Sequence, residues 1–157
     1  QKIPSYSKTG FEVIVEKRSQ FEDLKTGNTS IELAPIEPTF ISLMKNSPKA
    51  LFNAIARPHF GDVKSFFLAL ASIESFIISL LFVMAFFNFH KLNFNESNLV
   101  LFMLIYAFSL LLIIGWIVPN LGAIVRYRSI SLIILIPTLL HVVLKNEKIK
   151  SLIRFFT

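Results

Sequence analysis

The stretch SFFLALASIESFIISLLFVMAFFNF, residues 65–89, decides the fold class of this chain. It is apolar throughout except for scattered hydroxyl and amide groups and a single charged side chain, Glu74. Since an α-helix rises about 1.5 Å per residue, this length crosses a hydrocarbon core of about 30 Å with some tilt. A second run, LVLFMLIYAFSLLLIIGWIV at residues 99–118, carries no charge and places a tryptophan near its end, as is typical of a membrane interface.

A third apolar run, residues 130–144, is shorter and contains Pro137. The sequence PNLG at residues 119–122 separates it from the second run and predicts a helix break. We expect a helix near 124–144 that crosses the membrane only if 123–128 also enter it, and that is otherwise re-entrant or buried. The predicted fold class is therefore an all-α membrane protein, with two clear transmembrane helices (about 65–89 and 99–118) and a shorter third.

The charge of the chain is distributed unevenly. Of 16 Lys and Arg and 10 Asp and Glu in 157 residues, only three basic and two acidic residues fall within 65–144. The chain has no cysteine, which excludes disulfides, thiolate metal sites and cysteine nucleophiles. The three histidines are far apart, and there is no glycine-rich phosphate loop. We expect no metal, no cofactor and no nucleic-acid partner.

The parts outside the apolar runs are polar or amphipathic. Residues 1–38 are expected to form an extended extramembrane segment that lies over something larger, because apolar and acidic residues alternate over 11–16 in a strand-like pattern. Residues 39–64 are expected to hold an interfacial amphipathic helix and a linker. Residues 145–157 are expected to form a basic interfacial tail with an apolar face.

The amphipathic helix is predicted to start at Ser47-Pro48, which places a capping hydroxyl before a proline at the first helical position. Pro58 is expected to end it. Its two predicted faces consist of Leu51, Phe52 and Ile55 on one side and Lys49, Asn53 and Arg57 on the other.

The positive-inside rule places residues 1–64 in the cytoplasm, because they and residues 119–129 lie on the same side of two spans and hold most of the basic residues. The rule weakens for segments as long as residues 1–64. A third crossing would also place the basic tail on the other side of the membrane from these residues. The sequence therefore leaves the orientation open. The chain also starts at Gln1 without a signal-peptide pattern, and we expect it to be part of a longer polytopic protein or, alternatively, a processed small subunit.

Two residues are weak candidates for catalytic groups. Glu74 lies about ten residues into the first span, where a lipid-facing carboxylate costs about 2.5 kcal/mol or more. It is therefore expected to face protein, either as a proton carrier or base or as an acid that packs against a neighbouring helix, with Arg126 or Arg128 as its partner. His59 follows Arg57-Pro58 and is the second candidate, although histidines often cap or pack.

Three arginines are candidates for binding a phosphate or a lipid headgroup. Arg126 and Arg128 flank Tyr127 directly after the expected helix break, and guanidinium groups hold phosphates bidentately. Arg57 lies on the same side of the membrane by parity. The alternative is that these residues lie at headgroup level as positive-inside residues. In a helix, 126 and 128 point about 200° apart, so we expect Arg126 to point inward beside Gly122 and Arg128 to reach the surface or the amphipathic helix.

Two stretches carry a family resemblance: residues 47–75, with Ser47-Pro48, Arg57-Pro58 and the Ile-Glu step at Glu74, and residues 115–128, GWIVPNLGAIVRYR. Together they resemble the C-terminal part of polytopic bacterial membrane proteins found among genes for O-antigen and exopolysaccharide assembly. The Arg-Tyr step is also loosely similar to the last helices of lipid-linked-sugar glycosyltransferases, which usually carry prolines directly after it; here isoleucines follow.

The resemblance implies a multi-pass protein of the bacterial inner membrane with many more spans upstream. It also implies a role in cell-surface polysaccharide or lipid-linked glycan assembly, with a polyprenyl-pyrophosphate-linked sugar as the substrate. The alternative function is a non-enzymatic membrane subunit that packs on a larger complex, with membrane lipids and other helices as its partners. A transporter in which Glu74 couples an ion ranks last, because no inverted repeat is present. The sequence leaves open whether the protein is an enzyme.

Overall fold

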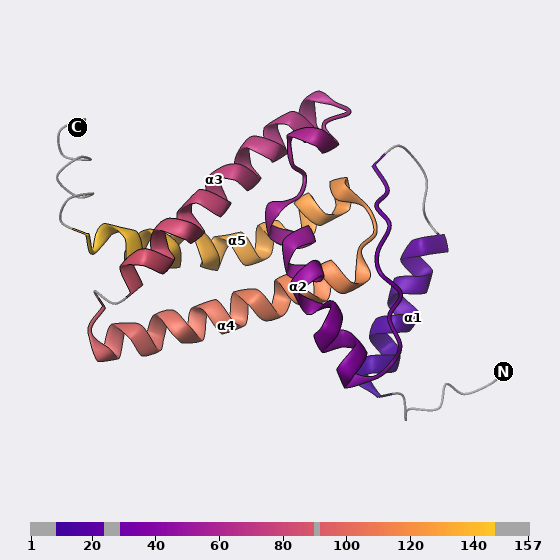
Figure 1. Cartoon of the computed structure of the whole chain (residues 1–157), viewed down its shortest axis with the longest axis horizontal. Helices are drawn as coiled ribbons and strands as arrows, with labels where there is room; N and C mark the ends of the chain where they lie inside the picture. Colours follow the sequence, from indigo (N-terminus) through magenta and orange to yellow (C-terminus); the bar gives the residue numbers. More distant parts are fainter. Residues whose placement is uncertain (1–8, 24–28, 90–91, 147–157) are drawn as a thin grey trace.

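The computed structural model describes residues 9–23, 29–89 and 92–146. Its elements in chain order are α1 (Gly10–Asp23), α2 (Phe40–Ala56), a short 3-10 helix η1 (Phe60–Asp62), α3 (Phe66–Asn88), α4 (Phe94–Ile117) and α5 (Leu121–Leu144). Figure 1 shows that α3, α4 and α5 extend together to one side, whereas α1 and α2 lie at the opposite end and α2 runs across them. The expected all-α fold is confirmed for the described part of the chain.

The helices α3, α4 and α5 are each long and apolar enough to cross a membrane, by length and composition. The third is not the shorter one that we expected, because α5 has 24 residues, as many as α4. It begins at Leu121, since the side chain of Asn120 accepts a hydrogen bond from the backbone N–H of Ala123 and caps the helix. The break at residues 119–120 is therefore a sharp turn, and residues 123–128 belong to the helix.

The helix α4 also starts earlier than the apolar run predicted. It begins at Phe94 because Asn93 and Glu96 form a capping box, in which each side chain accepts a hydrogen bond from the other residue's backbone. Residues 94–98, which precede the apolar run, are thus helical. The apolar run had located the hydrophobic part of the span, whereas the cap sets where the helix starts.

The core lies where the helices meet. α5 packs against both α3 and α4, and α2 packs across α4. Ala107, Leu111, Leu135 and Leu139 are fully buried at the centre of the main cluster. The crossing of α2 and α4 is close: a Cβ atom on Gly115 would lie 2.1 Å from the carbonyl oxygen of Ala50. Only glycine fits at this position.

The strand expected within residues 11–16 is wrong, because these residues belong to α1. A capping box starts this helix: the backbone N–H of Thr9 donates to the Glu12 carboxylate (2.9 Å), and the N–H of Glu12 faces the Thr9 hydroxyl (3.4 Å). Phe11 and Val13 are both exposed, so the alternation that indicated a strand does not mark a buried face.

Residues 31–37 form no helix or strand, and the start of this segment lies against the turn between α4 and α5. The N–H of Ile31 donates to the Pro119 carbonyl, and the N–H of Leu121 donates to the Thr29 carbonyl, both at 2.9 Å. Arg18 of α1 is buried and donates to the carbonyl oxygen of Ala34 at 2.6 Å. These contacts attach the N-terminal third to the α4–α5 turn.

The predicted start of α2 at Ser47-Pro48 is wrong. The helix begins at Phe40, where the Thr39 side chain accepts a hydrogen bond from the N–H of Ser42. Pro48 is inside the helix, and the Ser47 hydroxyl donates to the Leu43 carbonyl. The expected polar face is also partly wrong, because Asn53 is buried against the core whereas Lys49 is exposed. The predicted basic tail falls almost entirely on residues outside the described part of the chain.

Candidate functional site

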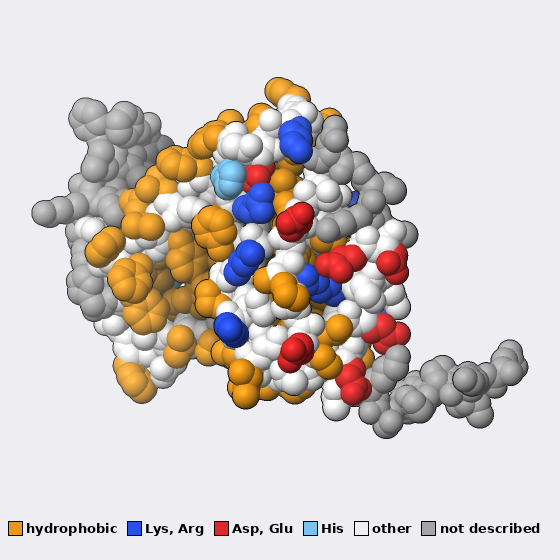
Figure 2. Space-filling view, turned by 45° about the vertical axis from the view of Figure 1, so that its right-hand side comes forward, with side chains coloured by type: hydrophobic (Ala, Val, Ile, Leu, Met, Phe, Trp, Pro, Cys, Tyr) orange, Lys and Arg blue, Asp and Glu red, His pale blue; other side chains and the backbone are white. Residues whose placement is uncertain are grey.

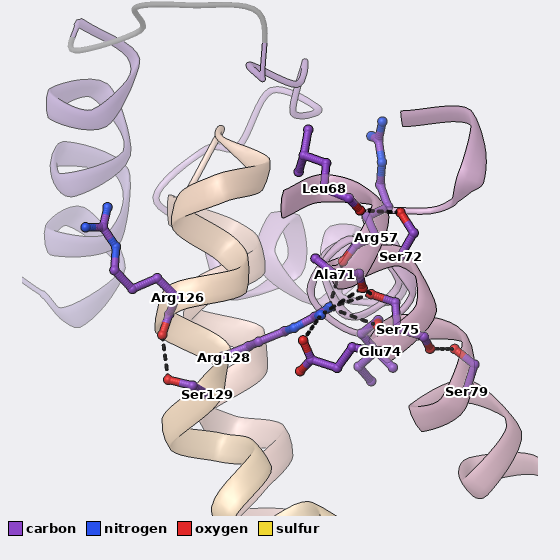
Figure 3. A network of polar contacts seen from close by, with 11 residues as sticks. Arg57, Leu68, Ala71, Ser72, Glu74, Ser75, Ser79, Arg126, Arg128 and Ser129 are labelled. Carbon is purple, nitrogen blue, oxygen red and sulfur yellow. Dashed lines mark hydrogen bonds and ion pairs between the residues drawn. The ribbon is translucent and has the colours of Figure 1, made fainter. Parts of the chain in front are cut away.

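Arg128 is the most deeply buried charged residue of the described chain, with an exposed fraction of 0%. Its Nη1 donates to the carbonyl oxygen of Arg57 at 2.8 Å and to the Ser75 hydroxyl at 2.9 Å. A longer contact of 3.4 Å reaches the carbonyl oxygen of Ile55. One guanidinium on α5 thus binds the C-terminal end of α2 and the first half of α3 (Figure 3).

The carbonyls that Arg128 binds have a physical need for a donor. The last carbonyls of a helix have no partner within that helix, and their partial negative charge favours a cation. Pro58 follows Arg57 directly and has no N–H to offer. Buried carbonyls in this position need a donor from elsewhere in the protein. Arg128 supplies it from another helix.

Glu74 is the ionic partner of Arg128, with Oε2 lying 3.4 Å from Nη2. Its side chain is 42% exposed, whereas that of Arg128 is fully buried. Glu74 was expected to pair with Arg126 or Arg128, and its partner is Arg128. The contact joins α3 to α5 as an ion pair between two helices.

Arg57 and His59 belong to a different network, centred on Asp62. The Arg57 guanidinium binds the Asp62 carboxylate bidentately, with contacts of 2.6 and 2.9 Å. This hydrogen bonding lowers the pKa of Asp62 and raises that of Arg57. The side chain of Arg57 is therefore directed to a protein carboxylate, while its backbone carbonyl binds Arg128.

His59 caps η1. Its Nδ1 accepts a hydrogen bond from the N–H of Gly61 at 3.1 Å, and its own N–H donates to Asp62 at 3.2 Å. The sequence interpretation missed Asp62 altogether, although the spacing His59-x-x-Asp62 is that of a capping box and could have identified it. This arrangement gives His59 a structural role.

Arg126 does not point inward as expected. It is exposed, and Figure 3 shows its side chain leaving α5 on the opposite side from Arg128. Its guanidinium carbon lies 5.7 Å from the ring centre of Tyr127, whose ring also contacts Phe21 of α1 edge to face. The prediction that 126 and 128 diverge is correct, and Arg128 reaches the end of α2, which was one of the two positions expected for it. The inward position expected for Arg126 is wrong, because α2 and α3 pack on the face that carries Arg128.

A cleft of about 110 Å³ has lining residues from both networks. It is lined by His59 and Phe60 from the α2–α3 connection and by Ser72, Ser75 and Ser79 from α3. The three hydroxyls donate to the carbonyls one turn earlier on α3, and Ser75 also accepts from Arg128. Among the described residues, Arg128 Nε and the Ser131 hydroxyl are buried without a hydrogen-bond partner.

The predicted charged residues therefore do not assemble into one site. Glu74 and Arg128 form one network, Arg57 and His59 form another around Asp62, and Arg126 stands apart. Within the described ranges, no group of three His, Asp or Glu side chains could hold a metal ion.

This architecture is compatible with an integral membrane protein. It has three apolar helices long enough to span a membrane, and the buried Arg128 joins the end of α2 to them. Comparison of the chain with protein-family models, with curated proteins and with solved structures finds no match.

Proposed function

We propose that the chain is a non-enzymatic, multi-pass structural subunit or module of a larger membrane complex. The observation that supports this most is the set of partners that Arg128, the most deeply buried charged residue of the described chain, has within the protein. Its Nη1 is directed to two backbone carbonyls and a hydroxyl of the protein itself, and its Nη2 faces Glu74. A guanidinium that is fully buried and directed to protein groups in this way joins helices and is not accessible to an incoming phosphate.

The outward face of α2 supports a position at the membrane surface. Ile41 and Phe52 are 79% and 57% exposed on this helix, and Lys45 and Lys49 are exposed beside them. Figure 2 shows basic side chains in a band between a largely apolar region and the region with most of the visible acidic side chains. Exposed apolar and basic residues on one helix are typical of helices that lie in the interface.

The helices α3, α4 and α5 then cross the membrane. Their outward side chains are large and apolar, and Phe86 and Phe87 of α3 are 77% and 68% exposed. In lipid, such faces pack equally well against acyl chains and against other helices, so the partner is set by shape rather than by polarity. We propose that the partners are membrane lipids and further helices of the same complex, in the inner membrane of a bacterium.

The absence of cysteine from the sequence makes a clean crosslinking test possible. Single-cysteine variants Phe87→Cys on the outward face of α3 and Ser75→Cys, which is buried, are expressed in the native membrane and treated with a short thiol–amine crosslinker. The proposal predicts a protein adduct of one defined mass from Phe87→Cys and none from Ser75→Cys. Lipid adducts alone from outward positions on all three spans would overturn it.

A second candidate function is a part in lipid-linked glycan assembly, and the exposure of Arg126 favours it. This side chain has no ion pair among the described residues and lies on the first turns of α5, beside Tyr127. A lipid phosphate or a polyprenyl-pyrophosphate-linked sugar carries the kind of anionic group that an exposed guanidinium binds. In the native cell, Arg126→Ala and Arg126→Lys should then lower lipid-linked glycan turnover. Unchanged turnover in a variant that still inserts would reject this role.

A further inference from the structure

A groove of about 430 Å³ lies between α4 and α5. Leu99, Val100 and Met103 line it from α4, and Ile133, Ile134 and Pro137 line it from α5. Its volume falls within the range of small-molecule sites, about 300–1,000 Å³. Nothing in the two networks around Arg128 and Asp62 involves these residues.

Pro137 lies inside α5 and is one of the residues that line the groove. Proline has no N–H, so the carbonyl of Ile133 receives no backbone hydrogen bond from it. The neighbouring Thr138 turns its hydroxyl back onto its own helix, donating to the Ile134 carbonyl at 2.6 Å. The wall of the groove is therefore apolar along its length.

Only one end of the groove is charged. Glu96, in the first turn of α4, and His141, in the last turn of α5, line this end. Lys145, the C-cap residue of α5, forms an ion pair with Glu96. The side chains of Lys145 and Glu96 are 33% and 31% exposed, so both charged groups remain accessible to a ligand. The end of the groove therefore presents an anionic and a cationic group side by side.

The groove is charged at one end and apolar along the rest of its length. A phospholipid has the same order, with its charged headgroup at the membrane surface and its acyl chains inside. The charged end lies where α4 begins and α5 ends, which is the membrane-surface end of both spans. From Glu96 to Met103 the groove extends about 10 Å at 1.5 Å per residue, about a third of the hydrocarbon core. This length suits the upper part of an acyl chain.

We propose that the groove binds a zwitterionic, amine-bearing phospholipid of the leaflet opposite α1 and α2, with one acyl chain between α4 and α5. Glu96 binds the ammonium group, and Lys145 binds the phosphate. An anionic lipid would satisfy Lys145 but place its phosphate beside Glu96, whereas an uncharged lipid would engage neither. The inference requires that α4 and α5 cross the membrane, but it does not depend on the packing proposed for the complex.

A second groove of similar volume, about 410 Å³, provides an internal control. It lies among α3, α4 and α5, and every residue that lines it is apolar, including Leu104. Met103 and Leu104 are adjacent in sequence but line different grooves. A reporter side chain at residue 103 therefore probes the groove with a charged end, whereas the same reporter at residue 104 probes the groove that is apolar throughout.

The test uses the full chain with its only tryptophan removed (Trp116→Phe) and one reporter added, either Met103→Trp or Leu104→Trp. Each variant is reconstituted in phosphatidylcholine vesicles that contain brominated-chain phosphatidylethanolamine or brominated-chain phosphatidylglycerol, and quenching of the reporter is measured. We expect phosphatidylethanolamine to be preferred about two- to fivefold at Met103→Trp, the size of one accessible ion pair. At Leu104→Trp the two lipids should quench equally.

Glu96→Gln supplies the matched variant, because glutamine keeps the capping-box hydrogen bond at the start of α4 but removes the charge. It should abolish the preference at Met103→Trp while the far-UV circular dichroism stays unchanged. The proposal is overturned by equal quenching at Met103→Trp, by a preference there for phosphatidylglycerol, or by a preference for phosphatidylethanolamine that survives Glu96→Gln.

Discussion

Gly115→Ala should separate α2 from the spans. The added Cβ would lie 2.1 Å from the carbonyl oxygen of Ala50 and 2.6 Å from its carbonyl carbon, so the two backbones must move apart by at least about 1.3 Å to restore an ordinary contact of 3.4 Å. Neither side can rotate out of the way, because both clashing groups belong to the main chain. Overpacking of this kind costs about 1–3 kcal/mol or more, and the gain in helix propensity offsets about 1 kcal/mol of it.

We therefore expect a net loss of about 2 kcal/mol in the free energy of unfolding. The assay is an SDS titration in mixed micelles, followed by far-UV circular dichroism and by the fluorescence of Trp116, which is next to the substitution. Gly122→Ala is the control, because a Cβ there meets only the Asn120 side chain at 3.4 Å, an ordinary distance. It should be neutral or slightly stabilising. Equal stability of the two variants would refute the close crossing of α2 and α4.

Two further predictions concern the polar contacts outside the spans. Thr9→Ala removes one side of the capping box of α1 and should cost about 1 kcal/mol locally, seen as faster amide exchange in residues 10–14 with no change in α4. Asp62 has a lowered pKa in the folded protein, so its pair with Arg57 stabilises the fold fully above the unfolded value of about 3.9 and is lost as the pH falls through the folded value. The stability advantage of the unmodified chain over Asp62→Asn should therefore be constant from pH 5 to 7 and shrink below about pH 4; an advantage that persists at low pH would show that the charge is not involved.

The spans were predictable because their signal is local. An apolar run such as residues 65–89 satisfies its backbone hydrogen bonds in a membrane by forming a helix, so it indicates a helix independently of the rest of the chain. The starts of α1 and α4 were missed although they too are local. In both cases a capping box, Thr9-x-x-Glu12 or Asn93-x-x-Glu96, outweighed the hydrophobic pattern on which the prediction relied.

The contacts of Arg128 with Glu74 and with the end of α2 were among the expected alternatives, but the choice between Arg126 and Arg128 as the inward residue could not be predicted in the same way. The helical period shows that Arg126 and Arg128 diverge, but it does not show which side α2 and α3 cover. That choice depends on contacts between residues more than 50 positions apart, such as Arg128 with Ser75 and with the carbonyl of Arg57. The assignment of Arg126 as the inward residue used only the space beside Gly122, and this local argument was overridden by the packing of α2.

The central claim is that Arg128 joins α2 to the spans, and its most direct test is the stability of Arg128→Met against that of Arg126→Met. The first variant loses two short hydrogen bonds from a buried charge and leaves the carbonyl of Arg57 and the carboxylate of Glu74 without their donor. We expect it to lower the free energy of unfolding by at least about 3 kcal/mol. The second changes an exposed side chain and should stay within about 0.5 kcal/mol of the unmodified chain. Equal stabilities of the two variants would contradict the account.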